Sequence, residues 1–310
     1  MRPELHVRLP NGTVVGYAET GDPAGHPVLY LHGRTSSRLE IGLSGLGEAA
    51  QDLGLRVLAP DRPGMGLSTF RPFSIADYPR LVRILADALE LGRFAVIGVS
   101  GGGKYACACA WQLADRVTRV ALVSSTCSFD LPGARATWSK EDQRVYPVAD
   151  RAPWLVRLYF AKFGRDIRQD PNALFSRFER TVGPADKEVL ADQGFHDALY
   201  RSIVEAFRQG GRGPAHDYAL EARPWGVPLA RINVPIEIWH GEDDQVVSPE
   251  QSRILARALP LVTEHYVPGE GHFSLFARHA EEVMQSVISG STTSRTPASG
   301  PSREPGGTTP

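Results

Sequence analysis

Cysteine is scarce in this chain of 310 residues. The three cysteines, Cys107, Cys109 and Cys127, are an odd number and include no C-x-x-C pair. This scarcity argues against a disulfide framework and against a cysteine-bound zinc ion. A reducing cytoplasm is therefore the expected location.

Long apolar runs and an excess of charge are also absent. The N-terminal stretch "MRPELHVRLPNGTVV" lacks the continuous apolar segment of a signal peptide, and no segment approaches the ~20 apolar residues that span a bilayer. The formal net charge is only -1. We therefore expect neither a nucleic acid nor a membrane as a partner.

What the chain does contain is a repeated alternation of strand and helix patterns. Helical patterns separate most of a series of short apolar runs, which are typical of strands buried on both faces. These runs are "PVLYLHG", "LRVLAPD", "FAVIGVS", "VTRVALVSS", "PIEIWHG" and "EHYVPG". Strands that alternate with helices predict a mostly parallel sheet flanked by helices, which is an α/β fold.

The alternation lapses once, and it ends before the C-terminus. Residues 128–230 carry arginines and aromatics at helical spacing and no convincing strand. We expect this segment, called the insertion below, to be helical and to cover one end of a core formed by residues 1–127 and 231–288. Residues 289–310 contain no aromatic residue and almost no apolar ones, which predicts a disordered tail.

The stretch "GVSGGGKY", residues 98–105, fits two functional motifs. It matches G-x-x-x-x-G-K, a loop that binds nucleotide phosphates, but Tyr105 stands where that motif needs a Ser or Thr for magnesium. It also matches G-x-S-x-G, a tight strand-to-helix turn that exposes a nucleophilic serine. The run "RFAVIGV" supplies the strand before this turn and "GGGKYACACAWQLA" the helix after it. We therefore favour the serine motif.

A nucleophilic serine requires a base that is oriented by a carboxylate. The acidic loop "HGEDDQVV" follows the strand run "IEIW", and "GEGHF" places His272 behind two glycines after the last strand run. Both segments, like Ser100, follow the carboxyl ends of predicted strands. Open parallel sheets carry their reactive groups at that edge.

Five segments, "YLHG", "DRPGMGLS", "GVSGGG", "HGEDDQVV" and "GEGHF", occur in this order over roughly residues 5 to 288. In these motifs the chain resembles the α/β-hydrolase superfamily, in its branch of cap-bearing, esterase-like serine hydrolases. The resemblance implies the α/β-hydrolase fold, with the insertion as a helical cap above the nucleophile.

By this resemblance, Ser100 is the nucleophile and His272 the general base. The family's G-x-x-D-x-x-V pattern maps onto residues 241–247 and makes Asp244 the acid that orients the base. The structural alternatives are a helix N-cap for Ser100 and a surface histidine for His272. The alternative acids are Asp243, Glu242 and Asp130.

The resemblance also implies an oxyanion hole formed by the backbone N–H groups of Gly101 and Arg34. Many relatives continue His-Gly-x-Pro in this loop, whereas this chain has Thr35 in the proline position, which predicts a less rigid loop. The Arg34 guanidinium has two interpretations. It holds a substrate carboxylate or phosphate, or it reaches solvent while only the backbone takes part. We favour the second.

Other charged residues near these motifs have less direct roles. Asp61 and Arg62 in "DRPGMGLS" are expected to hold loops together rather than to do chemistry. Lys104 lies one helical turn after Ser100, but a serine–lysine pair is not needed where a histidine and an aspartate are available. In the insertion, the aromatics are expected to pack helices or line an apolar pocket, and the mixed charges to form a solvated outer face.

Together these residues predict a serine hydrolase that forms an acyl-enzyme on a carboxylic ester, thioester or lactone of a small, largely apolar molecule, with no metal ion or organic cofactor. Serine at the nucleophile position argues against the related epoxide hydrolases and haloalkane dehalogenases, which use aspartate there. The same three residues also fit an iminopeptidase, a C–C bond hydrolase or a peracid-forming enzyme. A receptor, a binding protein or a cyclase on this fold is the non-hydrolytic alternative.

Overall fold

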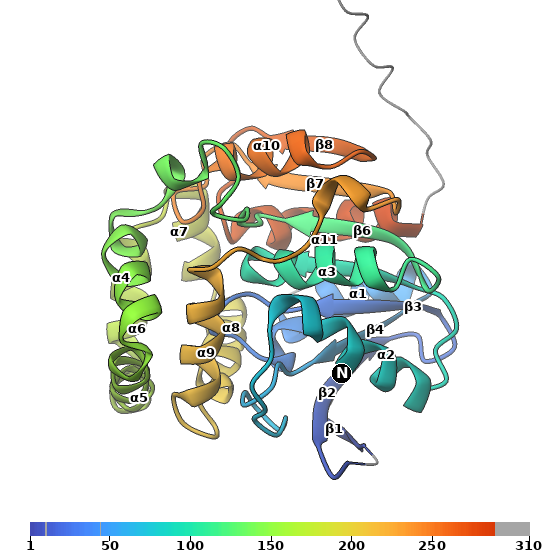
Figure 1. Cartoon of the computed structure of the whole chain (residues 1–310), viewed down its shortest axis with the longest axis horizontal. Helices are drawn as coiled ribbons and strands as arrows, with labels where there is room; N and C mark the ends of the chain where they lie inside the picture. Colours follow the sequence, from blue (N-terminus) through green and yellow to red (C-terminus); the bar gives the residue numbers. More distant parts are fainter. Residues whose placement is uncertain (10, 44, 289–310) are drawn as a thin grey trace, which may run out of the picture.

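A mostly parallel sheet forms the centre of the computed structural model, which describes residues 1–9, 11–43 and 45–288. Within these ranges the sheet has eight strands in the order β1-β2-β4-β3-β5-β6-β7-β8 (Figure 1). The strands are β1 Arg2–Arg8, β2 Val14–Gly21, β3 His26–Leu31, β4 Leu55–Pro60, β5 Phe94–Val99, β6 Val117–Val123, β7 Ile236–Gly241 and β8 Val262–Val267. Strand β2 runs against its neighbours β1 and β4, and the other adjacent pairs are parallel. The predicted parallel sheet is confirmed, whereas the predicted tail, residues 289–310, lies outside the described residues.

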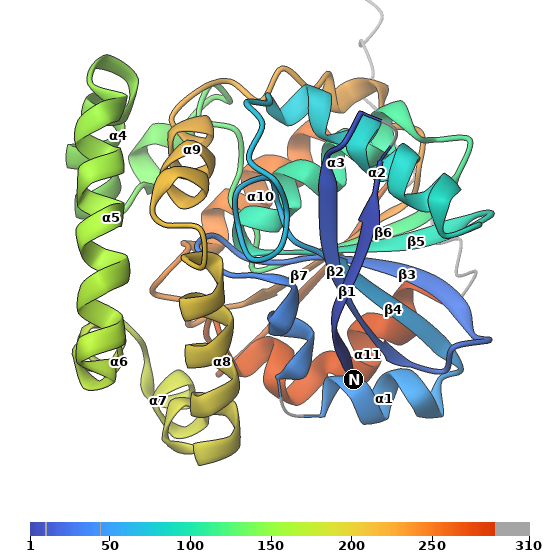
Figure 2. The ribbon, with the colours of Figure 1, turned by 90° about the horizontal axis from the view of Figure 1, so that it is seen from below.

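Both faces of the sheet are covered, which explains why its strands are continuous apolar runs. Side chains of β5 alternate between two buried clusters, with Phe94 and Val96 in one and Ala95 and Ile97 in the other. The first cluster includes residues of α2 (Tyr78–Ala88), α3 (Gly103–Gln112) and α10 (Pro249–Ala258), and the second includes residues of α1 (Leu46–Asp52) and α11 (Ser274–Ile288). Figure 2 shows α1 and α11 together on one side of the sheet. Successive residues of a strand point to opposite faces, so such a strand is apolar at every position.

The insertion, residues 128–230, contains helices and no strand, and it lies at the carboxyl edge of the parallel strands (Figures 1 and 2). Its α-helices are α4 Lys140–Arg151, α5 Pro153–Gln169, α6 Pro171–Glu179, α7 Pro184–Ala191, α8 Gln193–Ala206 and α9 Arg212–Glu221. Helices α8 and α9 lie between the sheet and the outer helices α4, α5 and α6. The helices share an apolar cluster that includes Phe160, Phe195 and Phe207. No helix in the described ranges is long and apolar enough to cross a membrane.

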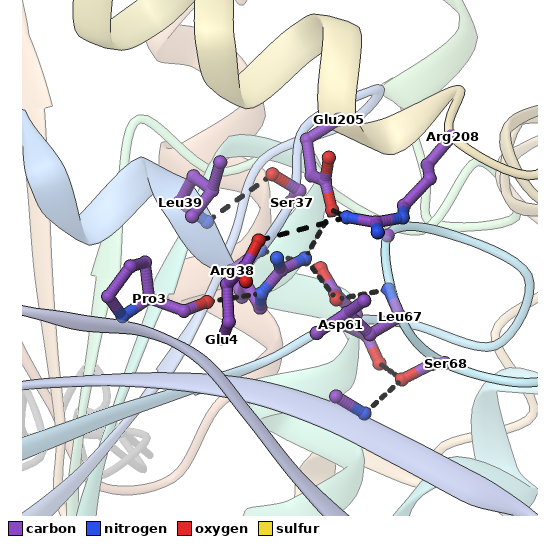
Figure 3. Close-up of polar contacts among 12 residues, drawn as sticks. Pro3, Glu4, Ser37, Arg38, Leu39, Asp61, Leu67, Ser68, Glu205 and Arg208 are labelled. Carbon is purple, nitrogen blue, oxygen red and sulfur yellow. Dashed lines mark hydrogen bonds and ion pairs between the residues drawn. The ribbon is translucent and has the colours of Figure 1, made fainter.

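A buried ion cluster ties the loops after β3 and β4 to the insertion (Figure 3). Arg38, which is 1% exposed, donates from Nη1 to the Asp61 carboxylate at 2.9 Å and to Glu205 of α8 at 2.7 Å. The fully buried Asp61 carboxylate also accepts the backbone N–H groups of Arg38 and Leu67, at 2.8 and 2.9 Å. Asp61 therefore holds loops together, as its place in the sequence motif predicts.

The variant Arg38→Met is expected to lower the free energy of unfolding by about 3–5 kcal/mol, because it leaves the Asp61 carboxylate buried without its counter-charge. Urea denaturation followed by far-UV circular dichroism measures the loss. The control is Arg83→Met, which breaks an ion pair with Asp115 whose side chains are 40% and 59% exposed. Exposed pairs contribute about 0–1 kcal/mol, so equal losses in the two variants would contradict a structural role for the buried cluster.

Candidate active site

Ser100 stands at a sharp turn between a strand and a helix. It is the first residue after β5 and begins a short 3-10 turn, Ser100–Gly102, that leads into α3. Its φ angle is 51°, in the left-handed region that costs a non-glycine residue about 1–2 kcal/mol. A strand that ends in such a residue and turns directly into a helix lifts the side chain out of the sheet, as a nucleophile elbow requires. Ser100 is partly exposed at this edge.

The glycines of the turn are required because other parts of the chain approach it closely. A Cβ on Gly102 would lie 2.0 Å from the carbonyl oxygen of Leu31. A Cβ on Gly103 would lie 2.3 Å from Oγ of Ser125. From the sequence alone, the third successive glycine only weakens the start of α3. The structure shows that Gly103 makes room for the side chain of Ser125, in the segment after β6.

Asp244 and His272 meet at the same edge of the sheet. Nδ1 of His272, in the loop after β8, lies 2.8 Å from Oδ2 of Asp244, in the loop after β7. Both residues are buried. The second oxygen of Asp244 accepts the N–H groups of Val246 and Val247, each at 2.8 Å. These bonds fix the carboxylate, which in turn orients the imidazole ring.

The other acids considered in the sequence analysis lie elsewhere. Glu242 and Asp243 are exposed, and Glu242 faces Arg253 at 3.7 Å. Asp130 accepts a hydrogen bond from the hydroxyl of the nearby Ser128. Of these four acids, the structure thus brings only Asp244 to the His272 ring.

A second histidine, which the sequence analysis did not single out, supports Asp244. Nε2 of His240, in β7, lies 3.2 Å from Oδ2 of Asp244 and 3.0 Å from the carbonyl oxygen of Val247. Because two acceptors face Nε2, the ring hydrogen belongs on that nitrogen. Burial raises the pKa of Asp244, but the His272 charge and the hydrogen bonds from both rings outweigh it and hold the pKa well below 3.8. The only signal for His240 in the sequence is its place directly before the acidic loop.

The basicity of His272 is set by the charges around it. Burial lowers the pKa of His272, but the Asp244 carboxylate and then Asp186 outweigh burial and the nearby Arg34, so the pKa lies above 6.5. Within residues 1–9, 11–43 and 45–288, no hydrogen bond joins this ring to the Ser100 hydroxyl. Many catalytic hydrogen bonds tighten only when substrate is bound.

The loop after β3 is oriented by a buried arginine. The Arg62 guanidinium donates to the carbonyl oxygens of His32 and Gly33, at 2.6 and 2.7 Å. A trans peptide points its C=O and its N–H in opposite directions, so this contact turns the N–H of Arg34 away from Arg62. The Arg34 nitrogen lies 3.3 Å from where a Cβ on Gly101 would stand. The two N–H groups expected to form an oxyanion hole are therefore neighbours.

Thr35, in the position where many relatives have proline, has a φ angle of 57°. Proline is restricted to φ near -65°, so it does not fit this backbone. The loop is held by hydrogen bonds instead. The N–H of Gly33 donates to the Glu40 carboxylate at 3.0 Å, and the Ser36 hydroxyl lies 2.7 Å from that of Ser202 in the insertion. The expectation of a less rigid loop took account of the missing proline alone and not of these hydrogen bonds.

The Arg34 side chain contacts the insertion, which corrects the expectation that it reaches solvent. Its Nη1 donates to the Tyr146 hydroxyl at 2.9 Å, to Glu221 at 3.1 Å and to Asp142 at 3.4 Å. The side chain is only 30% exposed. Helices α4 and α9 bring these partners over the loop, and no local pattern around Arg34 indicates them.

Further charges are buried between the core and the insertion. Asp217, on α9, accepts from Arg62 at 3.0 Å and from the Tyr105 hydroxyl. Nζ of Lys104 lies 3.5 Å from Asp217 and 3.4 Å from Glu221, without hydrogen-bond geometry. Lys104 thus faces carboxylates of the insertion. The expectation that the charges of the insertion form a solvated outer face is therefore wrong for Asp217 and Glu221. In the sequence, only their spacing of one helical turn indicates that they share a face of the helix.

A small pocket of about 20 Å³ lies between the insertion and the core loops that follow β3, β6 and β7. Its lining includes Arg34, Trp138, Asp142, Tyr146, Glu221 and Val246. A larger hollow of about 440 Å³ is lined by His26, Leu53 and Val287 among others, so it lies at the opposite end of the strands. The smaller pocket lies near the turn at Ser100, because Oε1 of Glu221, one of its lining residues, lies 3.2 Å from where a Cβ on Gly101 would stand. In the described ranges no group of three or more His, Cys, Asp or Glu side chains is arranged to hold a metal ion.

Comparisons with known proteins identify the family. Residues 26–278 match the family model described as the alpha/beta hydrolase fold, and the chain belongs to that family. Over 286 residues it is 25% identical to a poly(3-hydroxyalkanoate) depolymerase from Ectopseudomonas oleovorans, with 91% of this chain and 90% of the relative covered. Over 266 residues it is 29% identical to a non-heme chloroperoxidase from Streptomyces lividans, with 81% and 88% covered. A solved esterase from a Rhodococcus species has the same fold, with a TM-score of 0.65 at 21% identity over 93% of this chain and 99% of that one.

In the variant Asp217→Asn, the free energy of unfolding is expected to fall less steeply in acid than it does in the wild type. Burial raises the pKa of Asp217, but Arg62 and Lys104 outweigh it and hold the pKa well below 3.8. The unfolded chain therefore takes up the proton first, and the wild type loses this stabilisation as the pH falls below about 4. The variant lacks that titration, although at neutral pH it is about 3–5 kcal/mol less stable because two buried cations lose a partner.

Urea unfolding at a series of pH values measures both effects. The control is Asp87→Asn, which breaks a pair with Arg116 in which the Asp87 side chain is 59% exposed. This control should stay within about 1 kcal/mol of the wild type. An acid profile of Asp217→Asn parallel to that of the wild type would refute the role of Asp217.

Proposed function

We propose that the protein is a serine hydrolase that cleaves a carboxylic ester, thioester or lactone through an acyl-enzyme. The observation that carries the proposal is the contact of His272 with Asp244 at 2.8 Å, on the sheet edge where Ser100 has left-handed backbone. Strained backbone persists where the surroundings enforce it, and it is concentrated at functional sites. The names of two similar proteins, an esterase and a depolymerase, support the same class of chemistry.

In the proposed reaction, Oγ of Ser100 attacks the carbonyl carbon while Nε2 of His272 takes the hydroxyl proton. Asp244 stays ionised and stabilises the imidazolium through Nδ1. The N–H groups of Gly101 and Arg34 donate to the oxyanion that forms. His272 then gives the proton to the leaving alcohol or thiol. A water molecule, deprotonated by the same ring, releases the acyl group and restores Ser100.

An uncharged acyl group is the substrate that suits the pocket. Trp138 and Tyr146 supply apolar surface, while the charge of Arg34 is already shared between Asp142 and Glu221. Arg34 is the one cationic side chain among the described residues that line this pocket, so a substrate carboxylate would find the available positive charge already paired. A volume of about 20 Å³ holds roughly one water molecule, so an acyl group fills this pocket only when side chains that line it move.

The wild type is expected to react with a fluorophosphonate probe and to hydrolyse p-nitrophenyl esters. In Ser100→Ala the labelling should disappear and kcat/KM should fall by about 10⁴-fold or more, because the nucleophile is missing. A series of p-nitrophenyl esters of increasing chain length then measures the acyl preference.

Ser74→Ala is the matched control, since Ser74 caps a short helix remote from the site through the N–H of Asp77. It should label like the wild type. Labelling that persists in Ser100→Ala would refute the proposed nucleophile. A folded wild type that neither labels nor hydrolyses any ester would instead indicate a binding protein.

The variant Arg34→Ala is expected to lower kcat/KM for neutral and anionic esters by the same factor, to within roughly threefold. The reason is that Asp142 and Glu221, at 3.4 and 3.1 Å, already neutralise the guanidinium. Paired p-nitrophenyl esters, with and without a terminal carboxylate, measure the ratio. Arg151→Ala, at the exposed end of α4, controls for the change in net charge. A selective loss of more than about tenfold for the anionic ester would show that Arg34 holds substrate anions.

A further inference from the structure

Asp186, a residue of α7 in the insertion, binds the backbone of the loop that carries His272. Its Oδ2 accepts the N–H of His272 at 2.9 Å, and its Oδ1 accepts the N–H groups of Phe273 and Ser274, also at 2.9 Å. The Asp186 side chain is fully buried. One carboxylate of the insertion thus satisfies three consecutive N–H groups at and after the proposed catalytic base.

The loop is shaped to receive this carboxylate. A Cβ on Gly271 would lie 2.4 Å from Oδ2 of Asp186, so only glycine allows the approach. The N–H of Gly271 turns instead to the hydroxyl of Ser274, at 2.8 Å. Gly271 lies within the "GEGHF" motif. A glycine is needed directly before the histidine because the Asp186 carboxylate occupies the space of a side chain there.

The charge of Asp186 is directed at the same segment. Among the described residues, no Lys or Arg side chain forms an ion pair with Asp186. The carboxylate faces the N-terminus of α11 (Ser274–Ile288), whose free N–H groups carry a partial positive charge. It also lies close enough to the His272 ring to stabilise its charged form.

We propose that Asp186 is a positioning residue for His272. When α7 docks against the core, the Asp186 carboxylate orients the loop that carries this catalytic base. This inference rests on the proposed function, because it assumes that His272 acts as a base. Among the described residues, no hydrogen bond joins Asp186 to the Ser100 or Asp244 side chain. Asp186 acts through the backbone N–H groups of residues 272–274.

The charged groups facing His272 come from several elements. Asp244 binds Nδ1 from the loop after β7 and is itself held by His240, Asp186 approaches from α7, and Arg34 approaches from the loop after β3. Burial and Arg34 lower the pKa of His272, whereas Asp244 and Asp186 raise it. The base must be neutral to act, so kcat/KM rises as the pH passes upward through this raised pKa. Loss of the Asp186 charge should move that rise to lower pH.

The test is Asp186→Asn, which keeps the size of the side chain but removes its charge and one acceptor. We expect the acid limb of the pH profile of kcat/KM to move down by about 0.5 to 1 pH unit. At the pH optimum we expect kcat/KM to fall roughly tenfold or more, because the ring is less well oriented. The matched control is Asp192→Asn, which removes the same charge from the N-cap of α8, where Asp192 accepts the N–H of Phe195 at 2.8 Å. The control should keep the wild-type profile.

Nuclear magnetic resonance of histidine-labelled protein supplies a readout that does not depend on activity. The pKa of the His272 ring, assigned with His272→Gln, should fall in Asp186→Asn and stay unchanged in Asp192→Asn. The second variant, Asp186→Glu, keeps the charge but displaces it by one methylene group. It should keep a raised pKa and lose rate, and it carries the test if Asp186→Asn does not fold.

Unchanged pH profile and ring pKa in folded Asp186→Asn would overturn the positioning role while the hydrolase proposal stands. Equal shifts in Asp186→Asn and Asp192→Asn would also overturn it, because the effect would then be a general one of charge. A folded wild type that neither labels nor hydrolyses any ester would refute the hydrolase proposal instead, and the ring pKa would still report whether Asp186 tunes His272.

Discussion

The left-handed backbone conformation of Ser100, directly after β5, is the constraint on which the site depends. Its backbone is unfavourable for a residue with a Cβ, and it is held because strand, turn and helix are packed with almost no space between them. The carbonyl of Leu31 approaches the turn so closely that Gly102 has no substitute. This close packing places the Ser100 hydroxyl at the sheet edge and the N–H of Gly101 beside Arg34.

Three groups of the proposed chemistry, the Arg34 N–H, Asp244 and His272, are each held by a supporting residue. Arg62 turns the peptide before Arg34, His240 supports Asp244, and Asp186 binds the backbone at His272. Such supporting contacts reduce the reorganisation that a reaction requires, because the dipoles are aligned before the substrate arrives. Two of these supporting residues lie in the core and one in the insertion, so the proposed catalytic geometry depends on both.

The interface between core and insertion is built from buried charges as well as apolar side chains. Arg34, Arg62 and Lys104 face Asp142, Asp217 and Glu221 across it. Burial of such pairs contributes little net stability, since desolvation offsets the attraction. A displaced insertion, however, would leave several charges unpaired in a dry interface. The ion pairs therefore define one docked position more sharply than apolar contacts alone would.

The sequence by itself determined the parallel sheet, the helical insertion and the motifs around Ser100, Asp244 and His272, because these features are local: apolar periodicity, glycine turns and short spacings. Only the tertiary structure decided what surrounds them. Asp186 lies 86 residues before His272, and Glu221 lies 187 residues after Arg34. Such contacts depend on how whole helices dock. The sequence around a charged residue on a helix is the same whether the residue faces water or a buried partner.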